Sequence, residues 1–136
     1  SGSLGEKLKT VDDLMLTKDK IPFINENFNM KDALKLITKK KLGVLIARNS
    51  KGIPTGIITD GQIRRVSQKN NNLHSLRVKN VMTKNPIKVD KETLALKALS
   101  IMNDNKITSL CVNGSSNKNK IIGIIHIHNI LENNIN

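Results

Sequence analysis

Aromatic residues are almost absent from this sequence, which has two Phe and no Trp or Tyr among its 136 residues. Stacking of bases on aromatic side chains is a common way to hold single-stranded nucleic acid, and the composition counts against it. The hydrophobic fraction is 38%, so a core must be built from Ile, Leu, Val, Ala and Met. The length suits one compact α/β domain or two closely packed half-domains.

Cysteine is equally scarce, because Cys111, within the apolar run Leu110–Val112, is the only one. A single cysteine excludes an intrachain disulfide and is typical of a reducing compartment. Long hydrophobic runs are missing as well, and no signal-peptide pattern opens the chain. We therefore expect a cytoplasmic protein that has no membrane partner.

Acidic residues are few, since 11 Asp and Glu face 23 Lys and Arg, a formal net charge of +12. Such a charge attracts nucleic acid, a membrane surface or a phosphorylated metabolite. The alternative is compositional: Lys, Asn and Ile supply roughly two-fifths of the residues, as AT-rich codons would produce. The lysines are scattered apart from Lys39–Lys41. We favour the compositional interpretation and expect no nucleic-acid partner.

One motif occurs twice in the chain. Val11–Met15 is echoed by Val78–Met82, and each is followed by a proline-containing extended stretch and a helical pattern. The apolar residues Met30, Ala33, Leu34 and Ile37, and later Leu94, Ala98, Ile101 and Met102, fall at helical spacing. We expect Asn29 and Asp90 to be N-caps and Gly43 to end the first helix.

The two copies predict the same order of elements, β-α-β-β-α, which makes the fold class α/β (α+β). After the first strand and helix of the first copy, we expect strands at Val44–Ala47 and Gly56–Thr59 and a short helix from Gly61 to about Lys69. In the second copy, we expect strands at Ser109–Val112 and Gly123–His126 and a short helix from His128 to about Asn133. Strands that are nearly continuous in Ile, Val and Leu indicate sheets covered by helices.

These patterns predict two repeats that pack with pseudo-twofold symmetry and leave a cleft at their junction. The expected organisation is a leading segment at 1–10, a first repeat at 11–70, a linker at 71–77 and a second repeat at 78–136. Ser1–Gly5 is either an expression remnant or a native segment that leads in from a preceding domain.

The β-α-β-β-α order with a Gly-Ile-Ile-Thr-Asp turn into a helix resembles the cystathionine-β-synthase-type (CBS) domain, and the tandem resembles a Bateman module. Several runs are similar to the CBS pair of D-arabinose 5-phosphate isomerases: Thr10–Met15, Gly56–Arg65, Val81–Ile87, Lys106–Leu110 and His126–Leu131. The Thr-Asp-Gly-x-x-Arg-Arg and His-x-His turns together are the most specific part of this resemblance.

The resemblance implies an N-terminal sugar-isomerase (SIS) domain that this sequence lacks. In that family the isomerase interconverts ribulose 5-phosphate and arabinose 5-phosphate for Kdo and lipopolysaccharide synthesis. The resemblance further implies flat dimers of CBS pairs and a tetrameric parent protein.

The segment from Gly56 to Arg65 is the first candidate site. Free N–H groups and the positive end of a helix dipole meet where the strand passes into the helix, which suits a phosphate. Thr59 offers a hydroxyl group and Arg64 and Arg65 offer forked donors. The alternative is structural: Asp60 caps the helix and an Arg pairs with an acid. The resemblance favours the site, because this turn faces the ligand cleft in CBS domains.

The second copy carries His126, His128 and Asn129 at the corresponding turn. Two His at i and i+2 lie on one face if the strand continues that far, and a metal is one interpretation. No Cys, His or Asp cluster supports it, so we expect neither a metal nor a cofactor. By resemblance, these His line the cleft and bind an anionic ligand; the alternative is that they are simply exposed at a strand end.

Weaker candidates for the sides of the pocket are Thr83, Lys84, Thr108 and Ser109, which are equally compatible with capping or turn formation. CBS domains that bind adenosine nucleotides usually place an Asp three residues after the Thr, but Gln62 and Asn129 occupy those positions here. The resemblance therefore favours a different anionic nucleotide or nucleotide sugar, such as CMP-Kdo, over AMP or ATP.

No nucleophile–base pair, carboxylate dyad or phosphate-binding glycine motif appears in the sequence. We therefore expect no enzymatic activity from this chain itself. The preferred interpretation is a regulatory module that binds a small anionic metabolite and acts on its own SIS domain. The alternative is a structural oligomerisation module that has no ligand.

Overall fold

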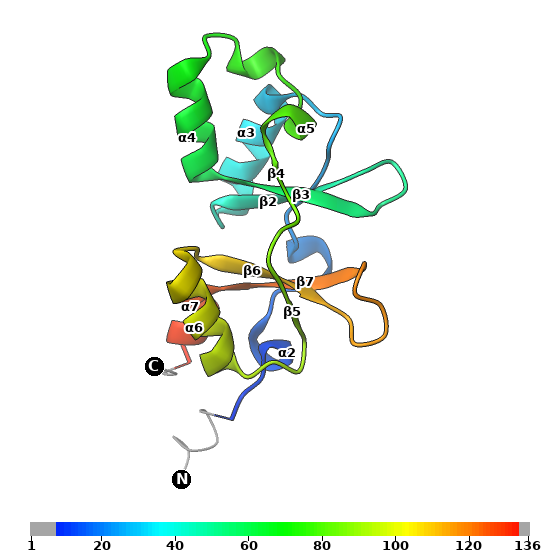
Figure 1. The fold of residues 1–136 in the computed structure, drawn as a ribbon, viewed down its shortest axis with the longest axis vertical. Helices are drawn as coiled ribbons and strands as arrows, with labels where there is room; N and C mark the ends of the chain where they lie inside the picture. The colour runs from blue at the N-terminus through cyan, green and yellow to red at the C-terminus, as the bar shows by residue number, and fades with distance from the viewer. Residues whose placement is uncertain (1–7, 134–136) are drawn as a thin grey trace. The chain divides into compact units, whose positions relative to one another are not determined.

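A computed structural model describes residues 8–133, and the chain divides into two compact units (Figure 1). Unit 2 is one continuous stretch, Pro22–Pro86. Unit 1 combines the segment that ends at Ile21 with the segment that begins at Ile87. Ser1–Gly5, for which the sequence leaves two origins open, lies outside the described residues.

Unit 2 contains a four-stranded sheet in the order β1-β2-β3-β4. β1 runs parallel to β2, and the remaining pairs are antiparallel. Its elements are β1 (Phe23–Asn25), α3 (Met30–Lys40), β2 (Val44–Arg48), β3 (Pro54–Thr59), α4 (Asp60–Lys69), the 3₁₀ turn η2 (Leu73–Ser75), α5 (Val78–Val81) and β4 (Thr83–Lys84).

Unit 1 contains a three-stranded sheet in the order β5-β6-β7, with β5 parallel to β6 and β6 antiparallel to β7. Its elements are α2 (Val11–Leu14), η1 (Lys18–Lys20), β5 (Lys88–Asp90), α6 (Ala95–Asn105), β6 (Ser109–Asn113), β7 (Ile121–His126) and α7 (Ile127–Leu131). The predicted β-α-β-β-α order is confirmed in both units. No helix in residues 8–133 has the length and apolarity to cross a bilayer.

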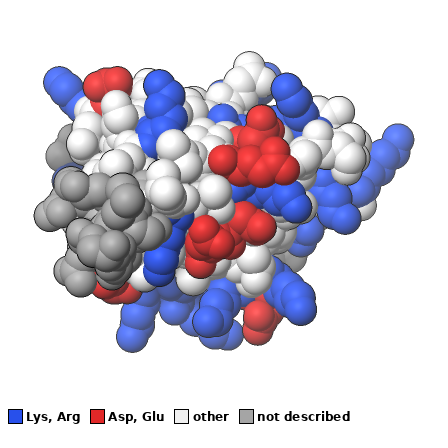
Figure 2. Space-filling model, turned by 90° about the horizontal axis from the view of Figure 1, so that it is seen from below, with Lys and Arg blue, Asp and Glu red and all other residues white. Residues whose placement is uncertain are grey.

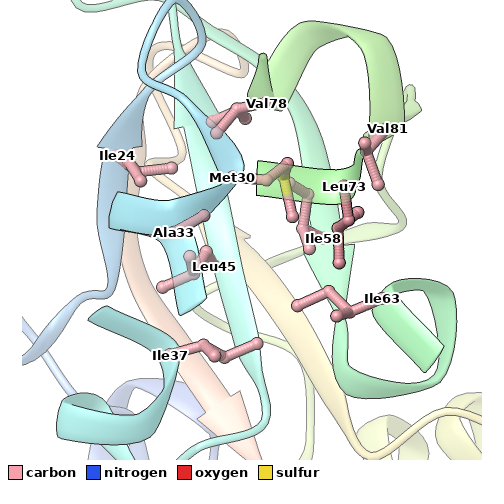
Figure 3. Close-up of a cluster of buried hydrophobic side chains, with 11 residues drawn as sticks. Ile24, Met30, Ala33, Ile37, Leu45, Ile58, Ile63, Leu73, Val78 and Val81 are labelled. Carbon is pink, nitrogen blue, oxygen red and sulfur yellow. The ribbon is translucent and has the colours of Figure 1, made fainter. Parts of the chain in front are cut away.

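The helices of unit 2 cover one face of its sheet. Figure 3 shows Met30, Ala33 and Ile37 of α3 converging with Leu45 of β2 and Ile58 of β3. Apolar residues that recur every three or four positions bring one side of α3 to the sheet, and burial of each large side chain contributes about 1.5–3 kcal/mol. Unit 1 repeats the arrangement with Ala95, Ala98, Met102, Leu110, Val112, Ile125 and Ile130.

Each unit takes its opening segment from the other sequence repeat. Residues 78–86 follow the first repeat and end in β4, which pairs with β3 through Gly56 and Lys84. In unit 1, Leu16 exchanges backbone hydrogen bonds of 2.8 and 3.0 Å with Ile124 of β7. Leu73 of η2, which lies in the predicted linker 71–77, is buried in the hydrophobic core of unit 2.

A glycine makes each of these close approaches possible. A Cβ on Gly56 would lie 2.7 Å from Met82 Sδ and 2.8 Å from the Thr83 carbonyl oxygen. A Cβ on Gly123 would lie 2.5 Å from Met15 Sδ and 2.9 Å from the Leu16 carbonyl oxygen. Each glycine therefore sits where another backbone crosses the sheet at contact distance.

Four helix ends depart from the sequence predictions: those of α6, α3 and α7, and the start of α4, which is Asp60 instead of Gly61. Asn29 caps α3 as expected, since its side chain accepts from the Asp32 N–H at 2.9 Å. Asp90 is not the cap of α6; it lies in β5, where its carboxylate accepts from Asn113 Nδ2 at 2.6 Å, and Leu94 occupies the cap position. Gly43 does not end α3, because Lys41 already turns the chain with a left-handed φ of 60°.

The third difference is at α7, which begins at Ile127, one residue before the predicted start. Lys106 ends α6 with a φ of 55°, as Lys41 ends α3. Both helices therefore stop at a lysine in the left-handed conformation, which is usually adopted by glycine, and no sequence rule identifies these lysines.

Replacement of Gly56 by Ala should destabilise unit 2 by about 1–3 kcal/mol, because the added methyl group overlaps a backbone carbonyl that cannot move freely. Urea unfolding of the 136-residue chain measures this loss. The matched control is Gly114→Ala, whose added Cβ meets its nearest atom at an ordinary 3.6 Å. Equal stability of the Gly56 and Gly114 variants would contradict the close approach.

Candidate functional site

The first candidate site is the corner of unit 2 where β3 passes into α4. Thr59 caps α4: its hydroxyl oxygen accepts from the Gln62 N–H at 3.3 Å. In return, Gln62 Oε1 accepts from the Thr59 N–H at 2.8 Å. This reciprocal capping box satisfies two helix-end donors at once. The expected strand-to-helix turn is confirmed, but the cap is Thr59 and not Asp60, which is the first residue of the helix.

The Gln62 carboxamide links the helix to β4. Its oxygen is occupied by the cap, and its Nε2 group donates to Thr83 Oγ1. The first repeat and the segment that follows it thus share one hydrogen-bonded corner. With an amide at position 62, no carboxylate stands three residues after the cap to accept hydrogen bonds from a ligand; the carboxylate of this corner belongs to Asp60, the first residue of α4.

Arg65 also reaches this corner. Its Nη1 atom lies 3.4 Å from the position that a Cβ on Gly61 would occupy, and Thr59 Oγ1 lies 3.9 Å from the same position. The guanidinium group therefore lies over the first turn of α4, next to backbone N–H groups at the positive end of the helix dipole. Positive charge concentrated in this way favours an anionic group such as a phosphate.

The second candidate site is the corresponding corner of unit 1. His126 ends β7 and caps α7: its Nδ1 accepts from the His128 N–H at 3.1 Å. Asn129 Oδ1 accepts from the His126 N–H at 2.8 Å. The strand does not continue through His128, as the shared-face prediction required. Instead the turn stacks the two rings, with centroids 4.8 Å apart.

The surroundings of His126 favour its neutral form. Burial lowers the pKa of His126 below its ordinary value of 6.5, and the neighbouring His128 lowers it further. Glu132 acts in the opposite direction. Because Nδ1 accepts a hydrogen bond from the backbone, the ring proton is on Nε2 in the neutral form.

Ser109 lies directly opposite His126 in the β6–β7 pairing, so the two side chains share one face of the sheet. Ser109 is 7% exposed, and its Oγ has no hydrogen-bond partner in the described part of the chain. A buried hydroxyl without a partner costs about 1–3 kcal/mol. The arrangement therefore favours a ligand group that donates to or accepts from this hydroxyl.

The remaining candidates are less closely associated with the two corners. Thr108 is exposed, and only its backbone carbonyl takes part, by accepting from the Ile127 N–H at 2.8 Å. Arg64 and Lys84 are exposed on α4 and β4. The structure thus brings Thr59, Asp60, Gln62, Arg65 and Thr83 together in unit 2, and Ser109, His126, His128 and Asn129 in unit 1.

Neither metal chemistry nor thiol chemistry is apparent in residues 8–133. No group of three or more His, Cys, Asp and Glu is placed there to hold a metal ion. Cys111 is buried, and burial raises the pKa of its thiol to about 12. The thiol is therefore protonated at neutral pH and is a poor nucleophile.

Glu132 is a residue that sequence reasoning missed. It follows His126 by six residues, as Arg65 follows Thr59 by six, so the two are equivalent positions in the repeat. Alignment of the two copies on their helix caps reveals this equivalence.

Comparison with known proteins agrees with the fold and its repetition. The CBS domain profile matches residues 11–69 and 78–135. The chain therefore belongs to the CBS domain family, as a tandem pair.

Among curated proteins, the arabinose 5-phosphate isomerase KdsD of Salmonella typhimurium is 37% identical over 131 residues, and that of Escherichia coli K12 is 35% identical. Each alignment covers 96% of this chain but 39% of the relative, so the chain spans about two-fifths of the length of these enzymes. An uncharacterized protein of Rickettsia prowazekii, RP505, is 33% identical over 130 residues, with the same coverage.

Solved structures show the same fold at low identity. The CBS-domain protein ATU1752 of Agrobacterium tumefaciens superposes with a TM-score of 0.82 at 18% identity, covering 94% of this chain and 95% of that one. The protein CBSX2, solved in complex with AMP, has a TM-score of 0.76 at 22% identity, covering 90% and 93% of the two chains.

Acidification should lower the stability of unit 1, because His126 becomes protonated. Because its folded-state pKa lies below the ordinary value of 6.5, the unfolded chain binds more protons between these two values. The free energy of unfolding therefore falls as the pH decreases through 6.5, and this contribution is fully lost below the folded-state pKa. NMR titration of the imidazole ring measures the pKa of His126, and urea unfolding at pH 7.5 and 5 measures the change in the free energy of unfolding.

Two variants separate protonation from capping. His126→Thr copies the Thr59 cap and should reduce the pH dependence while keeping the helix start. His126→Ala should cost about 1 kcal/mol at pH 7.5, because it removes the cap itself, and less at pH 5, where protonation of His126 already weakens the wild-type cap. An imidazole pKa above 6.5 in the wild-type protein would contradict the arrangement.

Proposed function

We propose that this chain is the regulatory CBS pair of an arabinose 5-phosphate isomerase and that it binds an anionic nucleotide or nucleotide sugar. Relatives that bear this enzyme name share 34–37% of the aligned residues over 96% of the chain. Catalysis belongs, in this proposal, to the SIS domain of the full-length protein, which interconverts ribulose 5-phosphate and arabinose 5-phosphate.

The unit 2 corner is the observation that carries the ligand proposal. The guanidinium group of Arg65 reaches back to the first turn of α4, where the Thr59 hydroxyl and the helix N-terminus also lie. Hydrogen bonds to charged groups are worth about 1.5–3 kcal/mol each, so a phosphate bound here gains more than a neutral group. CBSX2, which has the same fold, was solved with AMP, and the pair from MJ0100 was solved with 5′-methylthioadenosine and S-adenosylmethionine.

The capping boxes argue against an adenosine nucleotide bound through its ribose. A carboxylate three residues after the cap would accept from both ribose hydroxyls, but Gln62 and Asn129 stand there. Their side-chain oxygens already accept from the Thr59 and His126 N–H groups. We therefore favour a ligand recognised through phosphate and carboxylate groups, and CMP-Kdo, a nucleotide sugar of the same pathway, has both.

Regulation requires that the ligand bind two states of the protein with different affinities. In unit 2 the hydrogen bond from Gln62 to Thr83 connects the corner to β4, the strand after which the chain leaves this unit. A ligand that competes for the Gln62 amide would act on that strand directly. We propose this bond as the element through which occupancy is transmitted.

Calorimetric titration of the 136-residue chain with CMP-Kdo tests the proposal. Binding should be tighter than with AMP, and Arg65→Ala should weaken it roughly 10-fold through the loss of a charged hydrogen bond. Lys97→Ala, which removes one exposed positive charge from α6, is the matched control and should leave the affinity unchanged. No measurable heat at millimolar CMP-Kdo would refute the choice of ligand.

An oligomerisation module is the second candidate function. Leu94 and Leu131 are exposed apolar side chains of unit 1, with exposed fractions of 45% and 43%, and an interface between two copies that buries them gains free energy. The expected dimer of CBS pairs would cover them. Analytical ultracentrifugation should show a dimer that Leu131→Lys dissociates, whereas Lys97→Ala leaves it intact; a monomer at all concentrations would exclude this function for the isolated chain.

A further inference from the structure

The acidic residues of this protein are gathered in one of its two folded units. Unit 2 carries 13 Lys and Arg against 3 Asp and Glu, a net charge of +10, and unit 1 carries 10 against 8, a net charge of +2. On the face shown in Figure 2, acidic side chains lie in groups among basic ones. The net charge of +12 is therefore not a uniform positive coat.

In unit 1, α2 lies against the loop that joins β5 to α6. The Asp12 N–H donates to the Lys91 carbonyl oxygen at 2.9 Å. Thr10 forms an antiparallel bridge with Leu94, so the helix and the loop form one surface, which we call the acidic surface. Its residues include four exposed carboxylates and one lysine, a net charge of −3: Thr10, Asp12, Asp13, Asp90, Lys91 and Glu92.

Neutral groups hold the carboxylates of the acidic surface in place. The Asp13 carboxylate accepts from the Thr10 N–H at 2.8 Å, and that of Glu92 accepts from the Ser115 hydroxyl at 3.0 Å. Such donors orient a carboxylate without cancelling its charge. The surface is therefore both ordered and negatively charged, which favours a cationic partner.

The equivalent surface of unit 2 has the opposite sign. The Lys79 N–H donates to the Glu26 carbonyl oxygen at 2.9 Å. Arg77 forms an antiparallel bridge with Asn29, so both backbone contacts of unit 1 recur here. The six residues at equivalent positions, which we call the basic surface, carry two cations and one carboxylate, a net charge of +1: Asn25, Glu26, Asn27, Arg77, Lys79 and Asn80. A codon bias acts on both repeats alike and does not account for this change of sign.

Each surface also has one large apolar side chain that is exposed. Phe28, in the loop of the basic surface, is 51% exposed, and Leu94, in the loop of the acidic surface, is 45% exposed. The other aromatic residue, Phe23, is instead covered, because the Cζ atom of Arg48 lies 3.8 Å from its ring centroid. Protein interfaces are enriched in aromatic residues and Arg, with a polar rim around an apolar contact. Both surfaces combine these features.

We propose that the basic surface of one copy of this chain binds the acidic surface of a second copy. Two acidic surfaces would place charges of −3 opposite each other, and two basic surfaces would also repel. Unlike surfaces place Arg77 and Lys79 opposite carboxylates, and Phe28 and Leu94 leave water in the same contact. Charge complementarity of this kind determines which partner is bound and in which orientation.

The interface is heterologous, because it joins two different surfaces. Two copies that form it twice close into a dimer, whereas copies that form it once leave a surface at each end for further addition. The inference deepens the oligomerisation function proposed above by naming the surfaces involved, and it depends neither on a bound ligand nor on Leu131.

Sedimentation velocity of the 136-residue chain tests the proposal with two double variants. Arg77→Glu/Lys79→Glu reverses the charge of the basic surface, and Asp12→Lys/Glu92→Lys reverses that of the acidic surface. Each variant alone should associate at least roughly 10-fold more weakly than the wild type, because like charges then face each other. An equimolar mixture should associate again, since the native acidic surface of the first variant meets the native basic surface of the second.

Three further measurements separate a specific contact from general charge. Lys35→Glu/Lys39→Glu makes the same change of charge on exposed residues of α3 and should associate as the wild type does. Phe28→Ser, which leaves the charges unchanged, should weaken association roughly 10-fold through the loss of buried apolar area. Association should also weaken as the salt concentration rises from about 0.1 M to about 1 M, because the Debye length falls from about 10 Å to about 3 Å.

Cooperative unfolding in urea reports whether each variant is folded. Arg77 also has a structural contact, since its Nη1 donates to the Asn27 carbonyl oxygen at 2.8 Å. If its reversal disturbs unit 2, Lys79→Glu and Asp12→Lys repeat the exchange at equivalent exposed positions. Association of the basic-surface variant at wild-type strength would overturn the inference. So would a mixture that does not associate, or a wild type that is monomeric at every concentration.

The outcomes distinguish this interface from the functions proposed above. If Leu131→Lys dissociates the wild-type assembly and the surface variants do not, the oligomerisation function holds and this interface is wrong. If the surface variants dissociate it and Leu131→Lys does not, assembly proceeds through the acidic and basic surfaces. Binding of CMP-Kdo is measured separately by calorimetry, and its failure leaves this interface unaffected.

Discussion

The close approach of a second backbone at Gly56 and Gly123 is the constraint on which both units depend. A Cβ at either glycine would lie less than 3.0 Å from a neighbouring carbonyl oxygen, a separation that atoms do not tolerate. Only because a side chain is missing there can the segments around Thr83 and Leu16 lie against β3 and β7. Those segments come from the other sequence repeat, so each compact unit is assembled from both repeats.

The two candidate sites follow from how the chain turns out of these central strands. β3 and β7 each run directly into a helix, and the first helical turn needs an acceptor for its free N–H groups. Thr59 and His126 supply it, with Gln62 and Asn129 in return. Stability and the proposed function therefore use the same side chains, because the amide that completes the cap is also the group that the proposed ligand would contact.

Much of the fold was predictable because its signals are local. Helical spacing identified α3 and α6, short apolar runs identified β2 and β6, and the repeated turn identified both corners. The errors at Gly43 and Asp90 have a physical reason. A left-handed lysine is compatible with helix termination, and an Asp near a helix start can pair with Asn113 across the sheet. Neither choice is visible in residue type and spacing alone.

The sequence by itself determined the repeat, the order of elements and the chemical groups at each strand-to-helix turn, because these depend on periodicity and on neighbours in the chain. The tertiary structure decided which segments share a unit. It thereby set the net charge of unit 2 at +10 and that of unit 1 at +2. It also placed Arg65 over Gly61 and left the Ser109 hydroxyl without a partner. These features depend on backbone pairing between residues far apart in the sequence, and no local pattern encodes that pairing.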